Sequence, residues 1–60
     1  MTPRETAARI FVPFYVDMLL PRNKAKQCAI FSVIYILENL EISKTYKEYY
    51  REVLEELKSF

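Results

Sequence analysis

The stretch PRNKAK holds the side chains of this 60-residue chain that are best suited to bind a ligand. Arg22, Lys24 and Lys26 are basic and Asn23 is a polar amide, and all four fall at the beginning of a predicted helix. Basic residues there oppose the helix dipole, unless an anion also bonds to the free N–H groups of the first turn. Tyr15 precedes them, and its ring is suited to stacking on a base. These five residues form a candidate site for an anionic ligand such as a nucleotide, although they also fit a solvated basic turn.

Other constellations that carry chemistry are missing from the sequence. The chain has no histidine, which removes the usual general base and the imidazole metal ligand. Cys28 is the single cysteine, and we interpret it as a small buried hydrophobe rather than a reactive thiol. Glu52, Glu55 and Glu56 are typical of the solvated face of a helix. Since there is no glycine, glycine-rich phosphate loops are also excluded. We expect no enzyme, no metal and no cofactor.

The elements that position these residues are predicted to be three helices. The absence of glycine argues against tight hairpins and an all-β fold. Thr2-Pro3-Arg4-Glu5 has the pattern of a capping box with proline at the first helical position. We expect an all-α bundle with helices at about 3–19, kinked at Pro13, then 23–40 and 45–59.

Proline and capping residues set these boundaries. Pro13 either ends the first helix near Val12 or kinks it, and we favour the kink because the apolar spacing continues past it. Asn23 is the expected N-cap of the second helix, and Thr45 opens a second capping-box pattern.

Each predicted helix carries an apolar face with the spacing of helix packing. The expected core positions are Ala7, Ile10, Phe11, Phe14, Met18, Ala25, Ala29, Ile30, Val33, Ile36, Leu37, Leu40, Tyr46, Tyr50, Val53, Leu57 and Phe60.

The run CAIFSVIYIL, residues 28–37, is the only segment where a strand competes with a helix. A helix is favoured because no second strand-like run exists to pair with it. On that helix Cys28, Phe31 and Tyr35 form a second apolar strip opposite the core face, with Ile34 at the edge of the core face. This strip is covered either by the third helix or by another chain, and we prefer an intermolecular contact through Phe31, Ile34 and Tyr35.

A chain of this length is predicted to form a single domain of marginal stability. With one cysteine and no histidine, neither disulfides within the chain nor a structural metal is expected to reinforce it. Small domains that lack both often gain stability by oligomerisation, so we expect a homo-oligomer. The apolar runs are too short for a membrane span, and no cleavable signal pattern opens the chain. We therefore expect a soluble cytoplasmic protein.

We do not expect the chain to bind nucleic acid, because its net charge is only +1 and its basic cluster is small. A small nucleic-acid- or transcription-associated regulator and a structural adaptor are the alternatives to a ligand-binding protein.

The segments MTPRETA, NKAKQCAIFSVIYILENLE and YYREVLEELKSF together resemble a family of short, mostly uncharacterised helical proteins of phages and prophages. The resemblance implies a phage origin and a role in the infected cell. By analogy with other small phage proteins, it implies binding that counters host defence. Such a protein either sequesters a cyclic nucleotide signal or blocks a host defence protein directly.

Overall fold

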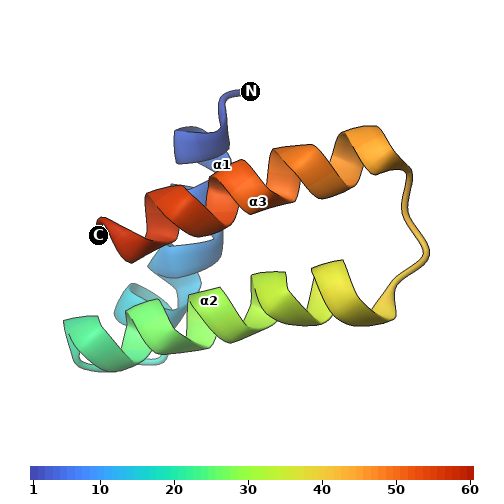
Figure 1. Ribbon diagram of the computed structural model, residues 1–60. Coiled ribbons are helices and arrows are strands. Elements are labelled where there is room, and N and C mark those ends of the chain that lie inside the picture. Colours follow the sequence, from blue (N-terminus) through green and yellow to red (C-terminus); the bar gives the residue numbers. More distant parts are fainter.

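The computed structural model describes residues 1–60 and contains three α-helices and no strand. The helices are α1 (Pro3–Val12), α2 (Arg22–Asn39) and α3 (Lys44–Lys58), and a π-helical segment, η1 (Pro13–Asp17), follows α1 directly. In Figure 1, α2 and α3 run antiparallel beside each other, and α1 crosses behind them. The all-α prediction and the helical reading of residues 28–37 are therefore confirmed.

The capping box at the start of α1 forms as the sequence predicts. The Thr2 hydroxyl accepts a hydrogen bond from the Glu5 N–H at 3.2 Å, and the Thr2 N–H donates to the Glu5 carboxylate at 3.0 Å. These two bonds satisfy donors that a helix start otherwise leaves free. The Thr2 N–H also lowers the pKa of the Glu5 carboxyl below its ordinary value.

The chain continues helically past Pro13, but as a π-helix that ends at Asp17 rather than at the expected Leu19. Proline has no N–H to donate to the preceding turn, which makes this a natural place for the hydrogen-bond register to widen. The Met18 N–H bonds to the Pro13 carbonyl at 3.1 Å, five residues back. Leu19 then takes a left-handed conformation with φ of 54°. This lets the Leu20 N–H reach the Phe14 carbonyl at 3.2 Å and ends the segment.

The starts of the other two helices differ from the predictions. The N-cap of α2 is Pro21, not Asn23, because Pro21 is extended and its carbonyl accepts the first helical bond, from the Ala25 N–H at 2.9 Å. The N-cap of α3 is Ser43, whose hydroxyl accepts from the Tyr46 N–H at 3.3 Å, so that α3 begins before Thr45. Both helices start one residue earlier than expected.

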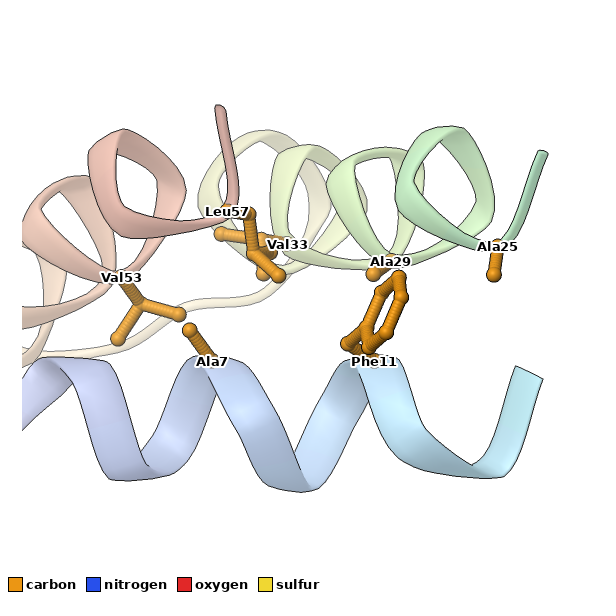
Figure 2. Close-up of a cluster of buried hydrophobic side chains, with 7 residues drawn as sticks. All are labelled: Ala7, Phe11, Ala25, Ala29, Val33, Val53 and Leu57. Atoms are coloured by element: carbon orange, nitrogen blue, oxygen red, sulfur yellow. The ribbon is translucent and has the colours of Figure 1, made fainter. Parts of the chain in front are cut away.

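Seven fully or almost fully buried side chains make the core, and every helix contributes to it (Figure 2). The residues are Ala7 and Phe11 from α1, Ala25, Ala29 and Val33 from α2, and Val53 and Leu57 from α3. In Figure 2 the labelled side chains of α1, Ala7 and Phe11, point toward α2 and α3. All seven belong to the predicted faces.

Three positions expected in the core are exposed instead. They are Met18, Leu40 and Tyr46, which are 61%, 47% and 62% exposed. Met18 and Leu40 lie just beyond the ends of η1 and α2, and Tyr46 lies in the first turn of α3. The periodic pattern therefore holds for the seven core residues and fails at these three positions near the ends of helical segments.

Candidate functional site

The predicted anion site lies where the beginning of α2 meets η1 and the end of α3. Arg22 stands over the ring of Phe11, with its guanidinium carbon 6.0 Å from the ring centre. Tyr15 stacks on the same ring, with the two ring centres 5.3 Å apart and the planes at 24°. The structure thus joins Arg22 and Tyr15 through Phe11, a cation and two aromatic rings in one cluster.

Lys26 is engaged elsewhere. Its ammonium group donates to the backbone carbonyl of Lys58 at 2.6 Å, at the end of α3. A cation there satisfies a carbonyl that has no partner within the helix and interacts favourably with the helix dipole. Lys26 therefore ties α2 to α3, and a ligand that used this ammonium group would have to compete with the carbonyl.

Lys24 and Asn23 are both exposed. Two residues along a helix differ by about 200° in direction, so Arg22 and Lys24 lie on different sides of α2. The Asn23 side-chain oxygen accepts from the Lys24 N–H at 3.0 Å, which already occupies one of the free donors of the first turn. Of the five predicted residues, the structure brings Arg22 and Tyr15 together and leaves the other three around the same helix end.

Phe11 is the member of this cluster that the sequence reasoning assigned only to the core. Its spacing of four residues from Tyr15 places both rings on one face of a helix, and this was the available signal. Phe14, the other aromatic residue near Tyr15, packs partly buried against the core.

The second apolar strip on α2 is open to solvent. Phe31 is 67% exposed and Tyr35 is 60% exposed, while Ile34 is half-buried. The buried residues Ala29 and Val33 lie on the opposite side of the helix, toward α1 and α3. The interpretation in which the third helix covers Phe31 and Tyr35 is therefore wrong.

A group of tyrosines on α3 packs near the N-terminal residues of the chain, and the sequence reasoning did not identify this feature. An open hollow of about 420 Å³ lies between the first residues and the start of α3, lined by Met1, Thr6, Thr45, Tyr46, Tyr49 and Tyr50. The Thr6 and Tyr49 hydroxyls hydrogen-bond to each other, and the Tyr49 hydroxyl also donates to the Thr2 carbonyl at 3.2 Å. Tyr49 therefore holds α1 against α3 rather than presenting a free hydroxyl.

The remaining chemistry is sparse. No three acidic, cysteine or histidine side chains gather into a group that could hold a metal ion. Cys28 is a free thiol and half-buried. None of the helices combines the length and the apolar character needed to cross a bilayer.

In comparisons with family models, curated proteins and solved structures, nothing matches this chain.

Proposed function

We propose that this chain is a non-enzymatic binding protein of phage origin that acts as a homo-oligomer in the host cytoplasm and counters antiviral defence by stoichiometric binding. The observation that carries the proposal is the exposure of Phe31 and Tyr35, on the side of α2 that faces away from the core. Large apolar side chains grouped on an exposed helix face are typical of a surface that contacts another molecule.

The proposed ligand is an anionic nucleotide signal bound near the beginning of α2. Arg22 supplies a charge that phosphate can pair with, and Tyr15 is a half-exposed ring on which a base can stack. Lys24 and Lys26 bring further positive charge to the same helix end, and Asn23 adds an amide. The phage setting comes from the resemblance of the three quoted segments, not from the site geometry.

Titration calorimetry with a panel of cyclic di- and trinucleotides tests the nucleotide ligand. We expect heat of binding from at least one of them, and a loss of at least tenfold in affinity for Arg22→Ala. Arg51→Ala is the matched control, because Arg51 is an exposed arginine on α3 outside the site. If no nucleotide in the panel produces heat, the proposed ligand is wrong.

The exposed strip also favours a second candidate, direct inhibition of a host defence protein through Phe31, Ile34 and Tyr35. The two candidates differ in what they require of the basic residues. In a bacterial host that carries a nucleotide-signalled defence system, expression of the chain should restore phage plating in both cases. The substitution Arg22→Ala should abolish this effect for the nucleotide ligand, because Arg22 lies at the proposed nucleotide site. It should leave the effect intact for a direct inhibitor.

A further inference from the structure

The outer face of α2 carries five residues with the spacing of a helix–helix seam. They follow one another in steps of four, three, four and three residues, as in a coiled coil. We call them the outer seam, and they are Lys24, Cys28, Phe31, Tyr35 and Glu38. The central aromatic pair is more than half exposed, and neither α1 nor α3 covers it.

The two ends of the outer seam carry opposite charges that have no partner within the chain. Lys24 and Glu38 are both exposed, and the ion pairs of the chain involve other residues. Lys24 lies seven residues before Phe31 and Glu38 lies seven residues after it. The two ends of the seam are therefore placed symmetrically about Phe31 and are complementary in charge, while Cys28 lies three residues before Phe31 and Tyr35 four residues after it.

We propose that the outer seam binds the same seam of a second copy in an antiparallel orientation, with a two-fold axis at Phe31. Each Lys24 then faces Glu38 of the other copy, the two Phe31 rings meet at the axis, and Cys28 lies next to Tyr35 of the other copy. A parallel pairing would instead place Lys24 against Lys24 and Glu38 against Glu38, which is unfavourable. An isologous contact of this kind uses one surface patch on both copies and closes at a dimer.

The size of the seam sets the expected strength of this contact. Its fourteen residue steps correspond to a length of about 21 Å at ~1.5 Å per residue. A single row of large side chains over that length is smaller than a standard stable interface. The pairing therefore produces a dimer whose population rises with protein concentration. This inference deepens the oligomeric part of the proposed function and rests on it.

Sedimentation equilibrium without ligand, from micromolar to millimolar protein, tests the pairing. The chain should shift from monomer to dimer, and Phe31→Glu should remain monomeric with an unchanged helical circular dichroism spectrum. Lys24→Glu or Glu38→Lys alone should weaken the dimer roughly tenfold or more, because the two-fold axis turns two attractive pairs into two repulsive ones. The double substitution should restore it, and Glu52→Lys on α3 is the control that should change little.

Disulfide trapping gives an independent readout of orientation. In the antiparallel pairing the two Cys28 residues are offset by six positions, about 9 Å along the axis, which is too far for a disulfide. Tyr35→Cys should place a second thiol next to Cys28 of the other copy and produce a covalent dimer on mild oxidation. The same substitution combined with Cys28→Ser should not.

Several results would overturn the pairing: a monomer at all concentrations, association that survives Phe31→Glu, single charge swaps that the double swap fails to rescue, or ready Cys28–Cys28 cross-linking. None of these results depends on a nucleotide. Failure of the dimer and failure of ligand binding in calorimetry are therefore separate outcomes.

Discussion

Leu19 offers a sharp test of the backbone geometry, because replacing it with glycine should stabilise the protein. Its φ of 54° is left-handed, and this costs a non-glycine residue about 1–2 kcal/mol. Glycine adopts the conformation freely, but it makes the unfolded chain more flexible at a cost of about 0.4–1 kcal/mol. Little packing is lost, since Leu19 is 84% exposed. The expected net gain is about 0.5–1 kcal/mol, or roughly 2–8 °C in Tm for a domain of this size.

Thermal unfolding followed by circular dichroism measures this gain, at one fixed protein concentration because association would shift Tm. Met18→Gly is the matched control. Met18 is the neighbouring exposed apolar residue, 61% exposed, but its φ of −93° is ordinary. The control should therefore lose stability where Leu19→Gly gains it. If both substitutions lower Tm by similar amounts, the left-handed conformation at Leu19 is not a source of strain.

Four further substitutions test the core, the cap and the contact between helices. Leu57→Ala should cost about 2–5 kcal/mol, most of the roughly 3–9 kcal/mol expected for 60 residues, so the helical signal at 25 °C should fall sharply. Thr2→Ala should cost about 1 kcal/mol by urea unfolding at pH 7. Because folding lowers the pKa of the Glu5 carboxyl, the ionised carboxylate stabilises the folded protein above the ordinary pKa of 4.5, and this stabilisation is lost as the pH falls through the folded pKa. In Glu5→Gln the urea midpoint should therefore fall less steeply with pH over this range. Lys26→Ala removes the bond to the Lys58 carbonyl and should cost about 0.5–1 kcal/mol in the same urea assay, with an unchanged helical spectrum.

The sequence predicts the fold best where local chemistry decides the structure. The capping box of Thr2 and Glu5 depends on side chains three residues apart, and it forms as expected. Val53 and Leu57 follow the packing period of α3, and both are buried. The end of the first helical segment is different, because a widened hydrogen-bond register after Pro13 and a left-handed Leu19 decide it, and in a chain without glycine no residue type marks the left-handed position.

The candidate site is predictable only in part, for a related reason. Positions along the chain place Arg22 and Lys26 near one helix end. The contacts of each side chain depend on how the other helices pack: Arg22 meets Phe11 of α1, while Lys26 meets the end of α3. Such long-range contacts are not encoded in spacing along one helix. The exposure of Phe31 depends likewise on where α3 lies, which the pattern of α2 alone left open.

The composition of the core also bears on when the protein can fold during its synthesis. Ala7 and Phe11 are made early, but the α3 residues that help to bury them, Val53 and Leu57, are made after both other helices. A nascent chain that has reached only Asn39 lacks the third side of its core. Because contacts distant in sequence complete the packing, stable folding must wait until the ribosome has released Leu57. Until then Phe11 lacks the neighbours that the last part of the chain supplies, among them Phe60, and the growing chain is open to chaperones and proteases.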